Sequence, residues 1–327
     1  MKYPQRWGDH VSAAPALIAH WTFDSARDSR VPFTGEIGGS RIEFEGALTG
    51  GGTIVTDGSA LIGAGAYRGT PAADNSSGIT LAGAALGSDG RTTLGRHLDL
   101  STAHSMSFSV WVKSSRAEAH GTLFHGYAPI GHAGYAIQTW PETGQPRYHP
   151  GWSEAPYYDG DGGGPPGLVD GQWRHLVVTA NGLEVRFYVD GRTEPGWRRV
   201  QAAISQGSYT GDRFIGHHAN TQYDSQVAGW LDDMGLWRNK ALAATDVAIL
   251  HGLGRLQGSD LSWLDTAATL WAGGPGDQAQ IDGVRWEKTS GLHGTLGAWG
   301  GSKDLHDGFI VLDESGGGIR MAGPASE

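Results

Sequence analysis

The sequence of 327 residues contains no cysteine. Neither a disulfide framework nor a thiolate metal site can therefore contribute to its stability or chemistry. No run approaches the ~20 consecutive apolar residues of a membrane-spanning helix, so we expect no membrane span. No cluster of Lys and Arg residues occurs, and the formal net charge is −10. The chain thus lacks the electrostatic footprint of a protein that binds nucleic acid or an acidic membrane.

The amino terminus lacks the continuous apolar stretch of a secretory signal. Its one apolar run, AAPALIA at residues 13–19, is short and is interrupted by Pro15. If Met1 is the native start, we expect synthesis and folding in the cytoplasm. If the start was engineered, a signal peptide has been removed and the protein is secreted.

Glycine is abundant, with 54 residues spread along the chain without a Gly-X-Y period, which favours many tight turns. Between these turns lie short runs that alternate or are rich in β-branched residues. Ten such runs are LIAHWTF, RIEFEGAL, GTIVT, MSFSVWVKS, GTLFHGY, GYAIQTW, WRHLVVTA, LEVRFYVDG, RFIGHH and VAGWLDDMGLWR. So many short strands predict an all-β sandwich.

Two local signals are sharper than the rest. Asn181-Gly182 joins two alternating segments, which predicts a β-hairpin with a type I′ turn, because both central positions of that turn need positive φ. Residues 241–253 predict the one helix, with Thr245 as its cap and Asp246 in its first turn. We expect this helix to end the main domain.

The motifs occur in the order LIAHWTFD, LDLSTAHSMSFSVWVKSS, GTLFHG, GYAIQ, GQWRHLVVTANGLEVRFYVDGR and GWLDDMGLWRNKALAATDVAILH. This order resembles the laminin G-like branch of the concanavalin A-like lectin and glucanase superfamily, over residues 17–255. The resemblance implies a jelly-roll β-sandwich of two antiparallel sheets, in agreement with the strand count. Residues 1–16 would form an N-terminal arm and residues 256–327 a small β-rich C-terminal extension.

In this resemblance GWLDDMGLWR is the last core strand and lies beside the first strand, where several relatives hold a structural Ca²⁺. The matching metal ligand is Asp232, with Asp24 as its partner. Two carboxylates, backbone carbonyls and water can supply the six to eight oxygens that Ca²⁺ needs. The alternative is that Asp232 holds a loop through hydrogen bonds from backbone N–H groups. Neighbouring strand residues face opposite ways, so we expect only one of Asp232 and Asp233 at this site.

The evidence for catalysis is thin, and we predict no catalytic residues. The E-x-D-x-x-E pattern of related glucanases is absent, and Glu43 and Glu45, which share one strand face, are better explained as exposed strand polarity. Alginate-lyase signatures are also absent, although isolated candidates exist at Gln138, Tyr148 and His149.

Two further clusters could suggest a metal site. The histidines are His125, His132, His149, His217 and His218, and the acidic loop contains Asp159 and Asp161. Neither cluster has regular ligand spacing. Surface or loop-packing histidines and a solvated loop are the preferred interpretations.

Carbohydrate binding is better supported, because aromatic side chains are concentrated in residues 135–158 with few aliphatics. Aromatic faces stack on the C–H faces of sugars, while neighbouring polar groups bind the hydroxyls. The candidate glycan-binding residues are Trp140, Tyr148, Trp152, Tyr157 and Tyr158. The alternative is that these aromatics fill the sandwich core and pack a long loop.

We therefore expect a non-catalytic carbohydrate-binding or adhesion protein, with a polysaccharide-degrading enzyme or a purely structural assembly subunit as alternatives. A lectin-like module without a signal peptide or cysteine fits a phage virion surface protein that recognises host glycans. The tryptophan-rich segment 256–327 would then contact neighbouring subunits. The alternatives are that these tryptophans complete the core and that the chain is a truncated secreted module.

Overall fold

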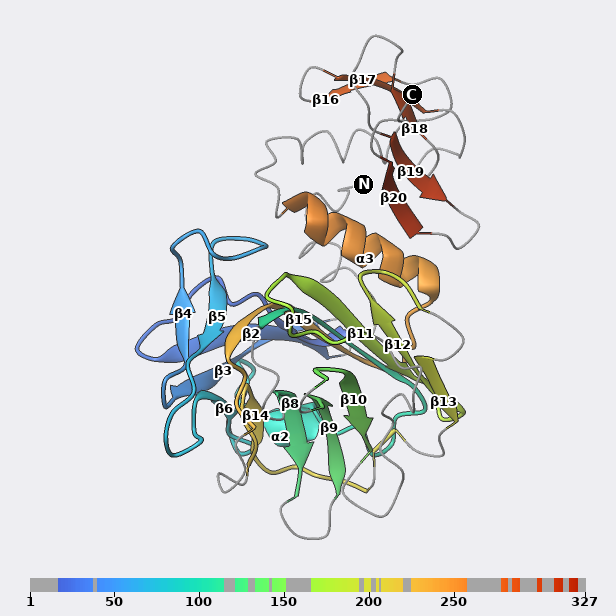
Figure 1. Ribbon diagram of the computed structural model, residues 1–327. Coiled ribbons are helices and arrows are strands. Elements are labelled where there is room, and N and C mark those ends of the chain that lie inside the picture. Colours follow the sequence, from blue (N-terminus) through green and yellow to red (C-terminus); the bar gives the residue numbers. More distant parts are fainter. Residues whose placement is uncertain are drawn as a thin grey trace. The chain divides into compact units, whose positions relative to one another are not determined.

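The structure is a computed structural model (Figure 1). It describes residues 17–37, 40–114, 121–128, 133–140, 143–150, 166–193, 197–200, 204–205, 207–219, 225–257, 278–281, 284–288, 299–301, 309–313 and 318–322. One compact unit spans Ala14–Leu242, and a second contains the residues from Ala243 onward.

The first unit is an antiparallel β-sandwich of two facing layers (Figure 1). The first layer has the order β10 (Pro146–His149), β9 (Gly134–Thr139), β8 (Thr122–Tyr127), β14 (Arg213–Ile215), β6 (Gly78–Leu81), β3 (Ser40–Thr49) and β2 (Arg30–Ile37). The second has the order β1 (Leu17–Trp21), β15 (Gly229–Arg238), β7 (Met106–Ser114), β11 (Arg174–Ala180), β12 (Glu184–Val189) and β13 (Arg198–Val200). A short side ribbon, β4 (Thr53–Val55) and β5 (Ala66–Gly69), pairs with β15, and the helical turn α2 spans Leu94–His97. The predicted all-β sandwich is confirmed.

Strand β1 joins the two layers. It pairs with β2 at one position, His20 opposite Thr34, and with β15 over most of its length. The two layers are therefore parts of one continuous hydrogen-bonded sheet.

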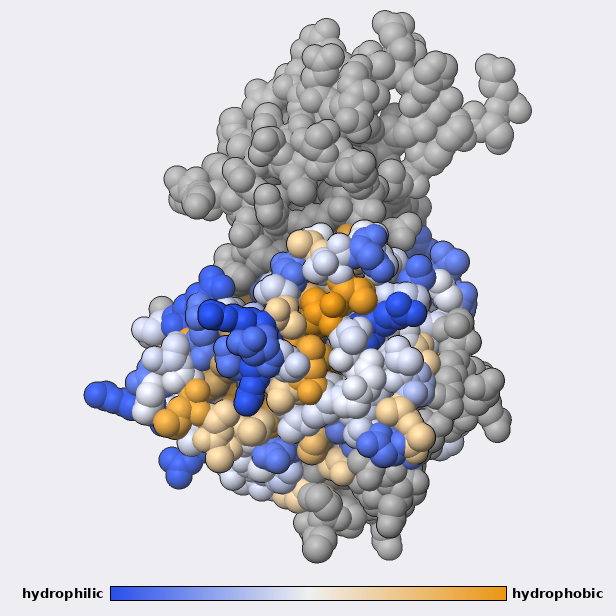
Figure 2. All heavy atoms as spheres, turned by 90° about the vertical axis from the view of Figure 1, so that its left-hand side faces the viewer, coloured by the Kyte–Doolittle hydropathy of each residue, from blue (hydrophilic) through white to orange (hydrophobic). Residues whose placement is uncertain are grey.

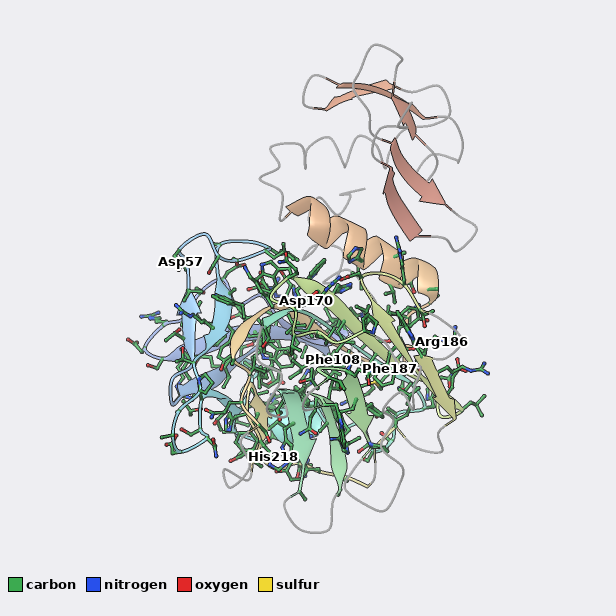
Figure 3. All side chains as sticks on the ribbon, viewed as in Figure 1. Asp57, Phe108, Asp170, Arg186, Phe187 and His218 are labelled. Carbon is green, nitrogen blue, oxygen red and sulfur yellow. The ribbon has the colours of Figure 1, made fainter. Side chains whose placement is uncertain are left out.

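Aromatic side chains from both layers fill the core, as strand alternation requires. Phe108 and Phe187 point between the layers (Figure 3). The ring of Phe124 from the first layer lies 6.2 Å from Phe108 and 6.1 Å from Trp21 of the second. Burying each such side chain contributes roughly 1.5–3 kcal/mol.

The predicted hairpin is confirmed, but its turn differs from type I′. Strands β11 and β12 pair from Leu176 opposite Val189 to Ala180 opposite Val185. Gly182 has a positive φ of 79°, whereas Asn181 does not. The Asn181 side chain instead accepts hydrogen bonds from the backbone N–H groups of Leu183 and Glu184. The loop is longer than the two residues of a type I′ turn. The hydrogen bonds of the Asn181 side chain stabilise this loop, so the Asn181 backbone does not need a positive φ.

Strand β15 contains a β-bulge at the acidic pair. Leu231 and Met234 both belong to the core cluster, although they are three residues apart. The register with β7 shifts between Asp232 and Gly235, and Asp233 has a φ of 39°. The extra residue places Asp232 and Asp233 together on the side away from the core. The unbroken alternation that the sequence prediction assumed does not hold at this pair, although only Asp232 of the two bonds to the 61–65 loop, whereas Asp233 contacts His20.

The second unit contains the predicted helix and five described strands. Helix α3 spans Ala244–Gln257 and contacts β20 (Gly318–Ala322), which forms a hairpin with β19 (Phe309–Asp313). A three-stranded sheet contains β16 (Gln278–Ile281), β17 (Val284–Lys288) and β18 (Trp299–Gly301).

Two details of this unit bear on the predictions. The helix begins at Ala244, so Thr245 lies inside it, and the Asp246 carboxylate accepts the Ala243 N–H at 3.1 Å. Trp286 and Trp299 lie on β17 and β18, whereas Trp263 and Trp271 lie outside the described residues. Across the described part of the chain, no helix combines the length and apolar character needed to cross a bilayer.

Candidate functional site

The first region of interest is the junction of β1 and β15, where Asp232 holds a loop. One carboxylate oxygen, Oδ2, accepts the backbone N–H groups of Leu61 and Ile62, each at 2.9 Å. The other oxygen, Oδ1, accepts the Asp233 N–H at 2.9 Å. The carboxylate is fully buried. These are the loop-holding contacts of the alternative interpretation.

Asp24 holds the same loop from the end of the first strand. Its Oδ1 accepts the N–H groups of Ala64 at 2.5 Å and Gly65 at 3.2 Å. Gly63, which immediately precedes them, has a φ of 67°, and a Cβ there would lie 2.1 Å from the Asp24 carboxylate. The two predicted metal ligands therefore lie at one five-residue loop, residues 61–65.

Burial shapes the charges around this junction. Desolvation, and then the charge of Asp233, raise the pKa of Asp232 well above its usual range. Desolvation, and then the charge of Asp24, do the same to the pKa of Asp233. His20 lies 2.9 Å from Asp233 Oδ1, and burial lowers its pKa to about 4. The junction thus collects carboxylates that a cation would stabilise in their charged form.

The donor set at the junction is compatible with Ca²⁺. Besides the two carboxylates, the backbone carbonyls of Phe23 and Val55 converge at Gly65, each about 3 Å from where its Cβ would be. Such hard oxygens suit Ca²⁺. Among the described residues no group of three or more His, Asp or Glu side chains could hold a metal, so carbonyls or water would have to complete the coordination.

The second region is the outer face of β8, β9 and β10. Gln138 and Arg147 are opposite each other on β9 and β10, and His149 lies two residues further on the same face. The Arg147 guanidinium lies 4.1 Å from the centre of the partly exposed Trp140 ring. The candidates Gln138, Tyr148 and His149 were predicted to lack companions. The strand pairing brings Gln138 and His149 together with Arg147, and these three side chains are buried.

Tyr148 is a correction to the predicted glycan site. It alternates with Arg147 and His149, so its ring faces the core and is fully buried. Its hydroxyl donates to the Ile204 carbonyl. The ring therefore has no exposed face for a sugar. The other predicted aromatics of this segment, Trp152, Tyr157 and Tyr158, lie outside the described residues.

Of the histidines in the predicted cluster, His125, His149, His217 and His218 are described, and all four are buried. His217 and His218 pack in the loop after β14, in agreement with the loop-packing interpretation, whereas His125 and His149 lie on strands. The ring centres of His125 and His218 lie 4.1 Å apart, and Phe214 lies between His125 and His217. Burial, and then the neighbouring histidines, lower the pKa of His125 well below its usual value. These rings extend the polar face of β8 across β14. His132, Asp159 and Asp161 lie outside the described residues.

Two other pairs could suggest an enzyme. Glu43 and Glu45 share the outer face of β3 and are exposed, as the sequence predicted. Ser109 Oγ lies 2.8 Å from His175 Nε2, which is the spacing of a nucleophile and its base. Both residues of the second pair are fully buried, so no substrate can reach them.

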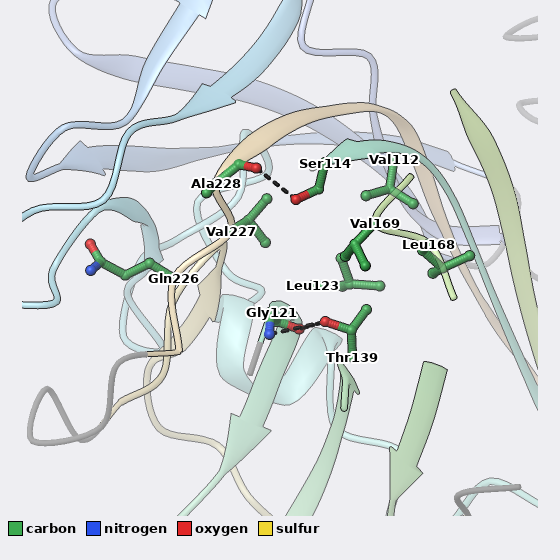
Figure 4. Close-up of a pocket in the computed structure, with 10 residues that line it drawn as sticks. All are labelled: Val112, Ser114, Gly121, Leu123, Thr139, Leu168, Val169, Gln226, Val227 and Ala228. Atoms are coloured by element: carbon green, nitrogen blue, oxygen red, sulfur yellow. Dashed lines mark hydrogen bonds between the residues drawn. The ribbon is translucent and has the colours of Figure 1, made fainter. Parts of the chain in front are cut away.

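A small pocket lies where β7 and β9 end and β8 begins (Figure 4). Its interior volume is about 10 Å³, which is room for one water molecule. The hydroxyls in its wall have partners, since Ser114 donates to Ala228 and Thr139 Oγ1 accepts the Gly121 N–H. This pocket is too small for a sugar.

Comparison with solved structures supports the fold. A Trypanosoma rangeli sialidase in complex with 2,3-difluoro-KDN superposes with a TM-score of 0.50 and 14% identity, over 76% of this chain and 34% of the sialidase. A second structure of that sialidase gives 0.50 and 13%, over 78% and 38%. The chain thus spans about a third of the sialidase.

A third structure is domain 4 of a GH43 extracellular arabinanase from Geobacillus stearothermophilus, in complex with arabinotriose. It has a TM-score of 0.48 and 23% identity, over 72% of this chain and 98% of that domain. No curated protein matches the sequence. Residues 86–248 match the family model of the concanavalin A-like lectin/glucanases superfamily. Together with the jelly-roll sandwich, this match identifies the β-sandwich unit as a member of the concanavalin A-like lectin/glucanase superfamily.

Proposed function

We propose that the sandwich binds carbohydrate without cleaving it, through the outer face of β8, β9 and β10. The observation that carries this proposal is the Arg147 guanidinium stacked on the partly exposed Trp140 ring, with Gln138 beside it. The exposed part of the Trp140 ring offers an apolar plane for a sugar, and the buried Arg147 guanidinium stacks on this ring and fixes its position.

The described acids do not supply a hydrolytic pair on this face. Hydrolysis needs two carboxylates about 5–10 Å apart on either side of the bond, with the general acid in a protected environment. Glu43 and Glu45 are exposed, and β6 and β14 separate their strand from β8. At 4.7–4.9 Å per strand, that is roughly 14 Å from the polar face.

A polysaccharide lyase is the second candidate, favoured by one observation. Gln138, Arg147 and His149 lie together on paired strands. All three side chains are buried, so this candidate requires the face to open before a substrate reaches them. An Arg and a Gln could then neutralise the carboxylate of a uronate while a His accepts the proton next to it. Such an enzyme would shorten an acidic polysaccharide by elimination.

The test is a glycan array followed by digestion of each bound polysaccharide. We expect retention of a glycan without shortening, and Trp140→Ala to abolish retention of neutral glycans while Trp197→Ala, another partly buried Trp, leaves it intact. Unsaturated products detected by ultraviolet absorbance would instead support the lyase. No retention of any glycan would contradict the proposal.

We further propose that Ca²⁺ stabilises the β1–β15 junction, held by Asp24 and Asp232 with backbone carbonyls. The fully buried Asp232 carboxylate, the partly exposed Asp24 carboxylate and the carbonyls that converge at Gly65 support this role. A bound ion stabilises only the folded state, so a chelator should lower the melting temperature and added Ca²⁺ should restore it. An unchanged melting temperature, with no calcium detected by elemental analysis, would contradict the proposed calcium site.

A further inference from the structure

On the outer face of the second layer, a tryptophan lies between two cationic side chains on neighbouring strands. Trp230 on β15 is opposite Arg68 of β5 on one side and Lys113 of β7 on the other. The Arg68 guanidinium carbon lies 5.4 Å from the ring centre, and the Lys113 ammonium nitrogen lies 5.3 Å from it. We call these three residues the cationic row.

The cationic row is accessible to a ligand. Leu231, next to Trp230, is in the core, so alternation places Trp230 on the outer side. Arg68 is exposed, while Trp230 and Lys113 are partly exposed. On the side of the molecule where β4 and β5 lie, hydrophilic and hydrophobic surfaces adjoin (Figure 2). A ligand with both a charged and an apolar part suits such a surface.

The charges of the row are not neutralised within the described part of the chain. Neither Arg68 nor Lys113 forms an ion pair there. Among the described acids, the pKa of the fully exposed Asp57 is lowered in part by the charge of Arg68, which is the weakest of its causes. The whole chain carries a net charge of −10, so two cations at one ring are a local exception. Bound anions would stabilise them.

We propose that the cationic row binds the carboxylate or sulfate group of an acidic saccharide. This inference rests on the proposed function, which supplies carbohydrate as the class of ligand, and it adds that the ligand is negatively charged. Arg68 can bind a carboxylate or sulfate through two parallel N–H donors, and Lys113 adds a point charge. The exposed part of the Trp230 ring contacts the apolar C–H groups of the same sugar.

The test uses glycans that differ only in charge. An array pairs each sialylated, sulfated or uronate glycan with its neutral or methyl-esterified counterpart, and titration calorimetry measures the best pair. We expect the acidic member to bind more tightly. The double variant Arg68→Gln/Lys113→Gln should weaken it about tenfold and leave the neutral member unchanged, as two partly exposed ion pairs imply.

The matched control is Arg91→Gln/Arg96→Gln, which removes the same charge from two exposed positions elsewhere. Equal loss in both double variants would show that only net charge matters and would overturn the inference. Glycan binding without preference for acidic members would also overturn it, while leaving the proposed function intact. Failure of every glycan to bind would contradict both. A change in oligomeric state of the Arg68 and Lys113 variant, with glycan binding unchanged, would reassign the row to contact between copies.

Discussion

Replacing Asp232 with alanine tests whether one buried carboxylate holds the 61–65 loop. The substitution removes the acceptor of three backbone N–H groups, those of Leu61, Ile62 and Asp233. The last two bonds are buried, and a buried N–H without a partner costs about 1–3 kcal/mol. Relief of the repulsion from Asp233 offsets part of this loss. We expect a net destabilisation of about 3 kcal/mol.

Asp232→Asn should be milder. The amide keeps one oxygen that can still accept from Leu61 and Ile62, and it removes the like charge next to Asp233. Only the bond from the Asp233 N–H is lost, so we expect a cost of about 1 kcal/mol. The ordering of the two variants is therefore a property of the hydrogen bonds rather than of charge.

Urea unfolding followed by tryptophan fluorescence measures these changes, because Trp21, Trp111 and Trp237 are fully buried reporters. For a unit of this size, 3 kcal/mol corresponds to roughly 6–12 °C in melting temperature. Asp57→Ala is the control, since that carboxylate is exposed and its hydrogen bonds come from the side chain and N–H of the nearby Ser59. Measurements in chelator separate the loop bonds from calcium. The reasoning is refuted if alanine costs less than about 1 kcal/mol in chelator, or no more than asparagine.

Three further predictions concern other parts of the chain. Burial lowers the pKa of His97 to about 4, so between pH 6.5 and 4 the unfolded state binds a proton that the folded state does not. The unsubstituted protein should therefore lose about 3 kcal/mol more stability over that pH window than His97→Gln, as measured by urea unfolding. Gly63→Ala should cost about 1–3 kcal/mol more than Gly58→Ala, because both have positive φ but only at Gly63 would the Cβ collide with Asp24; equal thermal shifts would contradict this. If residues 256–327 form an assembly contact, light scattering should show a multimer for the full chain and a folded monomer without them; a monomeric full chain would refute the contact.

Sequence periodicity predicted much of the fold, because it is a local signal. The alternation in residues 174–189 placed both hairpin strands correctly, and the motif order indicated the superfamily. The β15 bulge was not predictable from alternation alone, because a φ of 39° at Asp233 reflects its tertiary contacts. The resemblance to the superfamily correctly predicted that Asp24 and Asp232 lie at the same junction. The loop at 61–65, which donates to both, has no periodic signal.

The candidate glycan site shows a different limit. Counting aromatics included Tyr148, which lies in the core, and did not connect Gln138 with Arg147. The alternation in Arg147-Tyr148-His149 does contain the signal, since it separates the polar pair from the ring between them. Pairing of Arg147 with Gln138 depends on strand register, which composition cannot supply.

The position of β1 between β2 and β15 has a consequence for synthesis on the ribosome. Residues 17–21 emerge early, but their main partner is β15, which emerges more than 200 residues later. Strand β15 also pairs with β5 and β7, so several earlier strands wait for the same late segment. Contacts so distant in sequence close slowly. The nascent chain therefore keeps an unpaired β7 edge and exposed core residues until β15 is released, which is when chaperones would be most needed.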